Sequence, residues 1–364
     1  MKQPKRNQKV LYCSITDQLG GAEQVLKMIA RNQPETENHV FMLRGPYTGT
    51  WDDVTGITIH SPSGKGLLRS FWHLMAFVRK HPKWHRIYTT HIALTFLFGI
   101  MIRRKFLRKN EFIARESTVI FQRFKGIKLR KYRWMYRWGY TAVDLLICQT
   151  DFMKQQFTDN IPWLARQLNI QTICNPVDTN YIHKLASGTP SHLFPTPYVI
   201  TAGRFIPEKG FDVLLHAFKK LIQCYPELTL IIFGEGEQRD NLSAIIKNLG
   251  LNDKVFLPGY EKNIYPYLRK AELCVISSRK EGFPNVLLQM MALNTKVVST
   301  RCAGGIQDLP GLFTCNTEDV QNLCQAMALC LDSDTQYCRK LFDEDLEKRS
   351  VCRFLGQIDQ HLNE

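Results

Sequence analysis

Two cations, Arg204 and Lys209, follow a short apolar run at residues 198–201. Such a run, bounded by turn residues, predicts a buried strand of a parallel sheet. In open α/β sheets, ligands bind beyond the carboxyl ends of the strands. An arginine and a lysine fixed at that end can neutralise the charge of a diphosphate. The segment therefore predicts a site for a phosphorylated ligand.

The segment 277–289, SSRKEGFPNVLLQ, is the most specific in the chain. Pro284 suits the first turn of a helix, because its missing N–H would have no helical partner there. The backbone amides of Asn285 and Val286 would then point out of the helix, where they can cradle a phosphate. Three flanking residues complete this predicted site: Glu281, Phe283 and Gln289.

Glycines at predicted strand ends mark weaker candidates. Gly20 and Gly21 follow the apolar run 10–15 and begin a predicted helix, where glycines let a backbone approach a ligand and the helix terminus favours an anion. Gly234 and Tyr260 follow two later strands and are candidates for a base pocket. Each of these segments is equally compatible with an ordinary structural turn.

Two titratable residues in the first half of the chain are rival candidates for a chemical role. Glu116 lies in Arg115-Glu116-Ser117, directly after the predicted strand 112–114. His91 ends the predicted strand 87–90, where an ordinary strand-end histidine is the plain alternative.

Apolar runs alternate with amphipathic stretches along the whole chain, which is the pattern of βα units on parallel sheets. One series begins at residues 10–15 and another at 198–201. We therefore predict an α/β protein with two doubly wound, Rossmann-like domains that face a central cleft. The expected bounds are 1–178 for the first domain, 179–343 for the second, and 344–364 for a C-terminal helix that packs back on the first domain.

The net charge of +15 is concentrated in one segment: residues 101–140 hold thirteen lysines or arginines against Glu111 and Glu116. Tryptophan and tyrosine are interleaved with these cations. Anionic lipid attracts cytoplasmic basic clusters, and both aromatic residues prefer the membrane interface. We therefore expect this segment to bind an anionic membrane surface, with a merely solvated basic face as the alternative.

No apolar stretch approaches the roughly 20 residues that span a bilayer, and residues 1–10 are polar and basic. We expect neither a signal peptide nor a membrane anchor. The eleven cysteines form no CxxC pair and fit reduced thiols of the cytosol. The expected location is the cytoplasm, peripheral on the inner face of the membrane.

Several segments resemble the family 4 retaining glycosyltransferases of the GT-B fold, of the bacterial glycan or lipopolysaccharide type. They are GGAE at 20–23, GRFIPEKGFDVLLHAF at 203–218, IIFGEGEQRDNL at 231–242, FLPGY at 256–260 and SSRKEGFPNVLLQMMALNTKVVST at 277–300. The resemblance is dense from residue 175 to 309 and thin in the first domain. Matches in order across five consecutive βα units make chance agreement improbable.

The resemblance implies a hexosyl- or N-acetylhexosaminyltransferase that uses a nucleotide sugar, expected to be a UDP-sugar, with retention of configuration. Its second domain would bind the donor, with Arg204 and Lys209 on the diphosphate, Glu281 on the hydroxyls of the transferred sugar and the Asn285 region on the phosphates. Its first domain would bind a lipid-linked glycan or a lipopolysaccharide core as acceptor. The family needs neither a metal nor another cofactor.

Two positions depart from the family pattern. Its usual second glutamate is Gln289 here, which we place near the ribose of the donor, and its first-domain histidine is not clearly present. Glu116 and His91 are therefore the candidates for a role at the reacting carbon. The departures also leave open a protein that binds the donor but transfers little.

Two other classes are weaker alternatives. Asp-x-Asp patterns at 332–334 and 343–345 spell the metal site of a metal-dependent transferase, but they lie in a polar helical stretch and not at a strand end. The basic aromatic segment 101–140 also fits nucleic-acid binding, yet no known nucleic-acid-binding module accompanies it. We expect no bound metal and no nucleic-acid partner.

Overall fold

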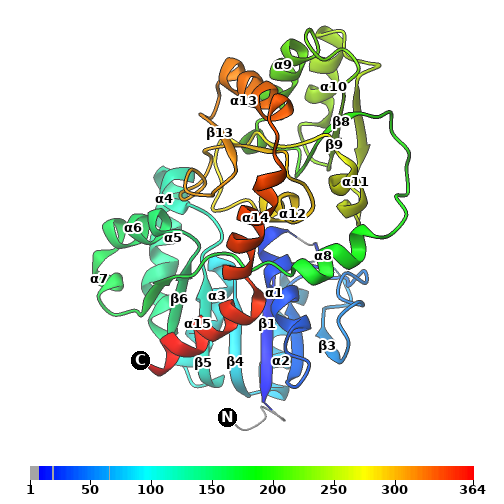
Figure 1. Cartoon of the computed structure of the whole chain (residues 1–364). Helices are drawn as coiled ribbons and strands as arrows, with labels where there is room; N and C mark the ends of the chain where they lie inside the picture. Colours follow the sequence, from blue (N-terminus) through cyan, green and yellow to red (C-terminus); the bar gives the residue numbers. More distant parts are fainter. Residues whose placement is uncertain (1–7, 19, 65) are drawn as a thin grey trace. The chain divides into compact units, whose positions relative to one another are not determined.

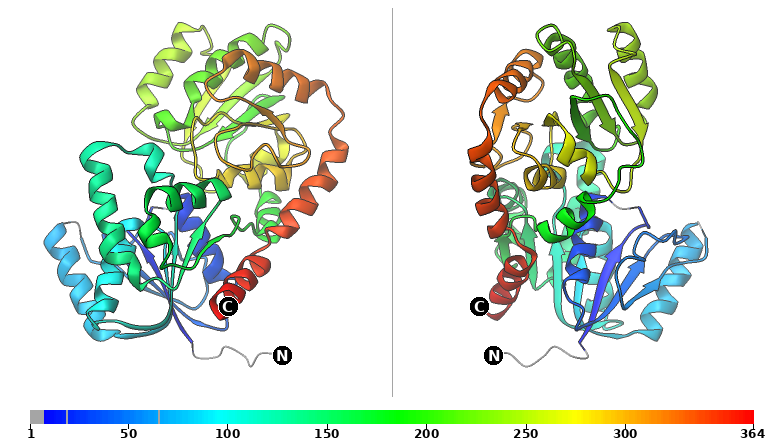
Figure 2. Two further views of the ribbon diagram at one scale, coloured as in Figure 1. Left: turned by 90° about the vertical axis from the view of Figure 1, so that its left-hand side faces the viewer. Right: turned by 45° about the vertical axis from the view of Figure 1, so that its right-hand side comes forward.

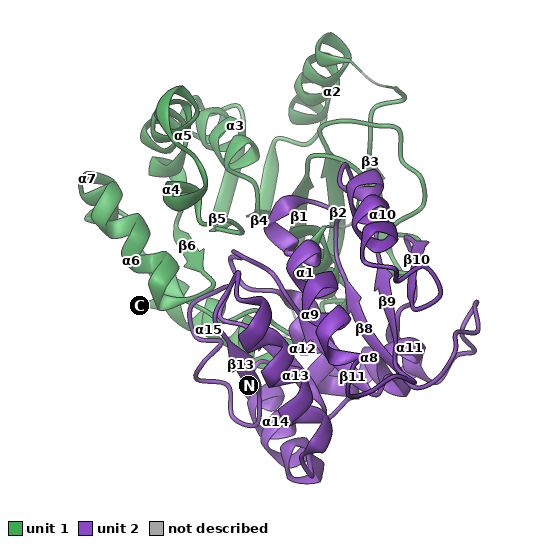
Figure 3. Ribbon diagram, turned by 90° about the horizontal axis from the view of Figure 1, so that it is seen from above, with its two compact units in different colours: residues 1–176, 351–364 green, residues 177–350 purple. Residues whose placement is uncertain are grey.

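The computed structural model describes residues 8–18, 20–64 and 66–364, and the chain divides into two compact units (Figures 1 and 3). Unit 1 comprises residues 1–176 and 351–364, and unit 2 comprises residues 177–350. The chain thus returns to unit 1 for its last helix. The predicted class, two doubly wound α/β domains, is confirmed.

Unit 1 is built, within the described ranges, on a seven-stranded parallel sheet in the order β3-β2-β1-β4-β5-β6-β7. The direction of winding reverses between β1 and β4, which is the place where such sheets bind ligands. The strands are β1 (Lys9–Ser14), β2 (Glu37–Met42), β3 (Ile57–His60), β4 (Lys83–Thr89), β5 (Arg108–Arg115), β6 (Leu145–Cys148) and β7 (Ile170–Thr172).

Helices pack on both faces of this sheet (Figure 2). One core contains Phe98 and Phe112, and the other contains Tyr12 and Phe354, the latter from the C-terminal helix. The helices are α1 (Gly21–Arg31), α2 (Leu67–Lys80), α3 (Ile92–Arg103), α4 (Ile120–Arg123), α5 (Gly126–Gly139), η1 (Tyr140–Ala142), α6 (Asp151–Asn160), α7 (Pro162–Ala165) and α15 (Val351–Asn363).

Unit 2 has a six-stranded parallel sheet in the order β10-β9-β8-β11-β12-β13. Its winding reverses between β8 and β11. The strands are β8 (Tyr198–Ala202), β9 (Thr229–Phe233), β10 (Val255–Gly259), β11 (Leu273–Ile276), β12 (Val297–Thr300) and β13 (Phe313–Cys315). The helices are α8 (Thr179–Ala186), η2 (Pro207–Lys209), α9 (Phe211–Leu221), α10 (Arg239–Asn248), α11 (Tyr265–Lys270), α12 (Asn285–Leu293), α13 (Val320–Asp332) and α14 (Gln336–Lys348).

The C-terminal tail is not one helix from residue 344. Helix α14 ends at Lys348 and α15 begins at Val351, and the N–H of Val177 donates to Arg349 O at 2.9 Å in the break between them. Phe354 and Ile358 of α15 are buried in the core of unit 1 beside α1.

Two further observations concern the helices and the cysteines. Among the described residues, no helix combines the length and the apolar character required to cross a bilayer. All eleven cysteines are free thiols, and Cys13, Cys148 and Cys274 are buried. Residues 1–7, part of the segment expected to lack a signal peptide, lie outside the described residues.

Candidate active site

Lys209 and Glu281 meet in unit 2. Lys209 ends η2, just after β8, and Glu281 lies in the loop after β11, which pairs directly with β8. The Lys209 Nζ lies 2.6 Å from Glu281 Oε1, and the hydroxyl of Ser278 donates to the same oxygen at 2.9 Å. Both charged side chains are less than one fifth exposed. The structure thus brings a cation and a carboxylate together at neighbouring carboxyl ends.

The backbone of Glu281 is also fixed. The N–H of Glu281 donates to Cys302 O at 2.8 Å, just after β12. On the other side, the hydroxyl of Ser277 donates to Lys209 O at 3.0 Å. The pair is therefore held by three adjacent strand ends, which makes its position rigid.

Two arginines near this pair differ in their partners. Arg204 is exposed, and in the described part of the chain its guanidinium has no hydrogen bond or ion pair. Arg279 instead donates to both carboxylate oxygens of Asp212, at 2.8 and 2.6 Å. Burial opposes the charge of Asp212, but these bonds lower its pKa below the ordinary value. Arg204 is thus available to an anion, whereas Arg279 has a structural ion pair.

The helix terminus of the 277–289 segment is shifted by one residue from the expectation. Pro284 is the N-cap, with φ −77° and ψ 105°, so it does not lie in the first turn and Asn285 is the first helical residue. An extended ψ is typical of an N-cap residue, which lies outside the helical conformation. The N–H of Val286 lies in the first turn, and Gln289 is half-buried one turn later.

The other predicted donor residues lie in different surroundings. The ring of Phe283 is buried in a core of unit 2, with the guanidinium of Arg349 5.3 Å from its centre. Gly234 has φ +145°, and a Cβ there would lie 1.8 Å from Gly203 O, so the loops after β8 and β9 can pack only around a glycine. Tyr260 is largely exposed after β10.

In unit 1, Gly20 and His91 converge on one carboxylate, and Gly21 begins α1. Gly20 is the N-cap of α1, and its N–H donates to Glu23 Oε2 at 3.1 Å. The other oxygen, Oε1, is hydrogen-bonded to His91 Nε2. Burial opposes the charge of Glu23, yet His91 and the Gly20 N–H together lower its pKa. The anion at this helix terminus is thus the protein's own Glu23, and a Cβ at Gly20 would come within 2.8 Å of it.

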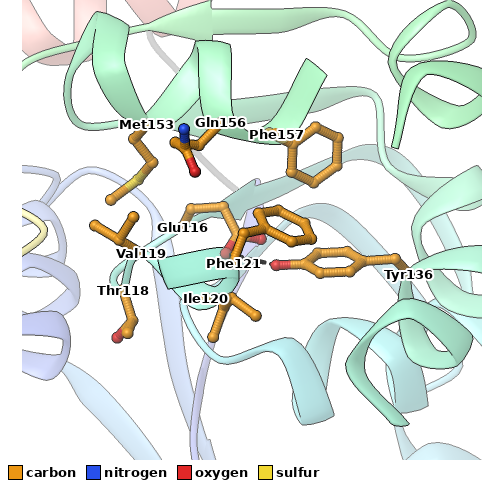
Figure 4. Close-up of a pocket in the computed structure, with 9 residues that line it drawn as sticks. All are labelled: Glu116, Thr118, Val119, Ile120, Phe121, Tyr136, Met153, Gln156 and Phe157. Carbon is orange, nitrogen blue, oxygen red and sulfur yellow. Dashed lines mark hydrogen bonds between the residues drawn. The ribbon is translucent and has the colours of Figure 1, made fainter. Parts of the chain in front are cut away.

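Glu116 lies on the opposite face of the sheet of unit 1, in a small cavity lined by Val119, Phe121, Met153 and other residues (Figure 4). Its oxygens accept hydrogen bonds from the hydroxyls of Tyr136, at 3.0 Å, and Tyr140, at 2.8 Å. Burial raises the pKa of Glu116 to about 7, although both tyrosines act in the other direction. Both oxygens therefore accept hydrogen bonds from tyrosines of α5 and η1. The structure does not bring Glu116 into contact with His91.

Sequence reasoning did not single out three residues of these clusters. Glu23 could have been found as the glutamate at the third position of a helix, where it can bond back to the N-cap. Ser278 lies within the quoted motif, but nothing in the sequence indicates that its hydroxyl contacts Glu281. Arg115 is buried with its Nη2 on Asn175 and with Nε and Nη1 unpartnered, which a strand pattern does not predict.

Two Rossmann-like units, each built on a parallel sheet, are the architecture of GT-B proteins. The structure of Anabaena Alr3699/HepE, solved in complex with UDP and glucose, superposes with a TM-score of 0.77 over 98% of this chain and 99% of that chain, at 18% identity. A sucrose-phosphate synthase of Thermosynechococcus elongatus gives 0.74 over 97% of this chain and 98% of that chain, at 15% identity. The GT-B fold is thereby confirmed.

Sequence profiles identify the family within this class. Residues 19–181 match the profile "Glycosyltransferase Family 4" and residues 196–333 match "Glycosyl transferases group 1". The first match covers most of unit 1, and the second lies within unit 2. The chain belongs to the family 4 glycosyltransferases, as the motifs of its second half indicate.

Curated relatives match over a part of their length. An N-acetylgalactosamine-N,N'-diacetylbacillosaminyl-diphospho-undecaprenol 4-alpha-N-acetylgalactosaminyltransferase of Campylobacter jejuni is 37% identical over 174 residues, 46% of each chain. The lipopolysaccharide core biosynthesis glycosyltransferase LpsE of Rhizobium meliloti is 31% identical over 161 residues, 44% of this chain and 45% of LpsE. The chain thus spans less than half the length of these relatives.

Proposed function

We propose that the protein transfers a sugar from a UDP-sugar, with retention of configuration, to a lipid-linked glycan or a lipopolysaccharide-type acceptor. The observation that carries this proposal is the convergence of Lys209, Glu281 and Ser278 at the strand ends of unit 2. The names of the relatives, a lipopolysaccharide core transferase and a transferase acting on an undecaprenol-linked sugar, support the acceptor class. HepE, solved with UDP-glucose, supports the donor class.

Each residue has a defined task in this proposal. The free guanidinium of Arg204 and the ammonium of Lys209 bind the donor diphosphate, together with the first-turn amides of α12. Glu281 then accepts hydrogen bonds from the hydroxyls of the transferred sugar. Before the donor binds, the two charges of the Lys209–Glu281 pair compensate each other, because both side chains are largely buried and an isolated charge would be costly there. Gln289 contacts the ribose as a neutral group.

The transfer is proposed to need no metal, since Arg204, Lys209 and the α12 terminus together supply the positive charge. The hexosyl or N-acetylhexosaminyl nature of the transferred group is part of the same proposal.

The membrane surface is proposed to bind α5 of unit 1. Ile127 and Trp134 are 85% and 54% exposed on this helix, and Arg130, Lys131 and Arg133 are exposed beside them. Lys128 lies 4.3 Å from the ring centre of Phe124, and Arg137 lies 5.9 Å from that of Trp163. Exposed aromatic side chains with interleaved cations suit a bilayer interface. A cytoplasmic protein, peripheral on the inner face of the membrane, follows from this proposal.

Thermal shift with a panel of nucleotides in EDTA tests the donor. A UDP-sugar at 100 times its Kd should stabilise the fold by about 2.7 kcal/mol. GDP- and ADP-sugars at the same concentration should give smaller shifts. A shift that appears only after manganese is added would contradict metal independence, and the absence of a shift with every UDP-sugar would contradict the proposed donor.

A further inference from the structure

The hydrogen bond between Glu23 and His91 fixes which nitrogen of the imidazole carries the proton. Glu23 is only an acceptor when ionised, and the Gly20 N–H and His91 hold its pKa below the ordinary value. Its Oε1 therefore requires a donor at His91 Nε2. In the neutral ring, the second nitrogen, Nδ1, then presents a lone pair.

This lone pair is accessible. The side chain of His91 is 28% exposed, and within the described residues no hydrogen bond engages its Nδ1. His91 is the N-cap of α3 and follows β4 directly, so it lies at the carboxyl edge of the sheet, where winding reverses between β1 and β4. An acceptor atom at such an edge suits a ligand hydroxyl.

The neighbouring groups are polar, and three of their buried atoms lack a hydrogen-bond partner. Thr89 pairs with Ala114 in the sheet, so Thr90 and Arg115 are the next residues past the paired ends of β4 and β5. The hydroxyl of Thr90 and the Nε and Nη1 of Arg115 are buried without a hydrogen-bond partner. Burial lowers the pKa of Arg115 to about 10, with Glu23 acting in the other direction. Arg115 thus stays charged at neutral pH and also favours the ionised form of Glu23.

We propose that Glu23 is a positioning residue, which holds His91 in the Nε2–H tautomer so that Nδ1 accepts a hydrogen bond from a hydroxyl of the acceptor sugar. This inference rests on the proposed transfer for its ligand, but its tautomer statement concerns the free protein. Glu23, the glutamate of the GGAE segment, then acts through His91. Gly20 is required because a side chain there would collide with the Glu23 carboxylate.

Glu23→Gln is the informative substitution, since it keeps shape and removes charge. The Gly20 N–H still requires an acceptor, so the amide oxygen faces Gly20 and the NH₂ group faces His91. His91 Nε2 must then accept, which moves the ring proton to Nδ1 and abolishes the lone pair there.

The molecule provides a matched control. Glu37 accepts from His39 Nε2 at 2.9 Å in the same unit, but Glu37 begins β2 and lies at the amino end of the sheet. Glu37→Gln therefore changes an equivalent Glu–His pair far from the carboxyl edge, and it should leave transfer unchanged.

Nitrogen-15 NMR of the histidine rings, with His91 assigned by comparison with His91→Asn, tests the tautomer without any substrate. The wild-type protein should show a protonated Nε2 and a bare Nδ1, and Glu23→Gln should show the reverse. A protonated Nδ1 in the neutral ring of the wild type would overturn the inference, whether or not the variant folds.

Kinetics test the ligand. Glu23→Gln should lower kcat/KM for the acceptor by about tenfold or more, while the KM for the donor stays unchanged, because one hydrogen bond of about 1.4 kcal/mol is lost. A normal acceptor kcat/KM with the reversed tautomer would contradict the role of Nδ1. If wild-type protein transfers no sugar while the tautomer is as stated, the proposed function fails and the positioning of His91 stands.

Discussion

At the scale of single residues, substitution of Lys209 can distinguish a role in donor binding from a role in stability. Lys209→Ala should cost about 2–4 kcal/mol in transfer, because developing diphosphate charge loses a fixed cation. The matched control is Lys296→Ala: Lys296 Nζ lies 2.6 Å from Glu272 Oε1 in the same unit, but both residues precede their strands, at the amino ends of β11 and β12.

The measurement is kcat/KM for the donor, with the melting temperature of each variant. Lys296→Ala should retain the wild-type kcat/KM even where it lowers the melting temperature. Equal losses of kcat/KM in both variants would show that Lys209 acts through stability alone.

Glu116 gives a pH-dependent stability. Its folded-state pKa, about 7, lies above the ordinary value of 4.5, so the unfolded chain binds fewer protons between these values and stability falls as pH rises through that window. The full effect is of order 3 kcal/mol. Glu116→Gln has no charge to bury and keeps partners for Tyr136 and Tyr140.

Urea unfolding from pH 4.5 to 7.5 checks this prediction. The stability of Glu116→Gln relative to wild type should rise with pH, and the relative gain should level off above pH 7. If the difference in unfolding free energy between Glu116→Gln and wild type does not vary with pH, the Glu116 carboxyl is more solvated than its place in the cavity of Figure 4 implies.

At the scale of elements, α5 is the part whose role depends on charge and exposure together. Reversal of Arg130, Lys131 and Arg133 to glutamate should abolish most binding to vesicles that contain phosphatidylglycerol, because each cation near an anionic surface contributes about 1 kcal/mol. Donor affinity should not change, since these exposed side chains lie in unit 1. Vesicle sedimentation at low and high salt measures the effect.

A charge-matched control lies on unit 2, where Lys247, Lys270 and Lys340 are exposed on α10, α11 and α14. Their reversal to glutamate changes the net charge equally and should weaken vesicle binding far less. Equal losses in the two triple variants would reduce the membrane proposal to a general effect of net charge.

The elements also show what the sequence could predict. The apolar runs of β1 and β8 were predicted near their observed places, whereas only the end of β4 was predicted, because charged and polar residues occupy its first half. β2 was missed because the buried polar residues Asn38 and His39 interrupt its pattern, and β7 and β13 because three residues carry too little periodicity. In the site, the motifs identified Lys209 and Glu281, but only packing shows that they touch, since no local rule links residues 72 positions apart.

At the scale of the whole molecule, two units together make up the GT-B fold, and α15 belongs to unit 1. The amphipathic tail pattern predicted a helix, and its assignment to unit 1 depends on long-range contacts: Phe354 is buried beside α1, and Asp359 Oδ1 lies 2.8 Å from Arg86 Nη2. Truncation of α15 would leave the buried Arg86 with one carboxylate partner fewer.

The central claim, transfer of sugar from a UDP-sugar, is tested most directly by labelled product. Protein, a panel of radiolabelled UDP-sugars, EDTA and an undecaprenol-linked glycan or lipopolysaccharide core fraction are combined, and label in the lipid phase is measured. Wild-type protein should transfer label from one UDP-sugar. Glu281→Ala should transfer far less at equal donor saturation, because the hydrogen bonds from the sugar hydroxyls to the Glu281 carboxylate stabilise chiefly the transition state. Donor binding without any labelled lipid, in wild type and variant alike, would contradict the claim.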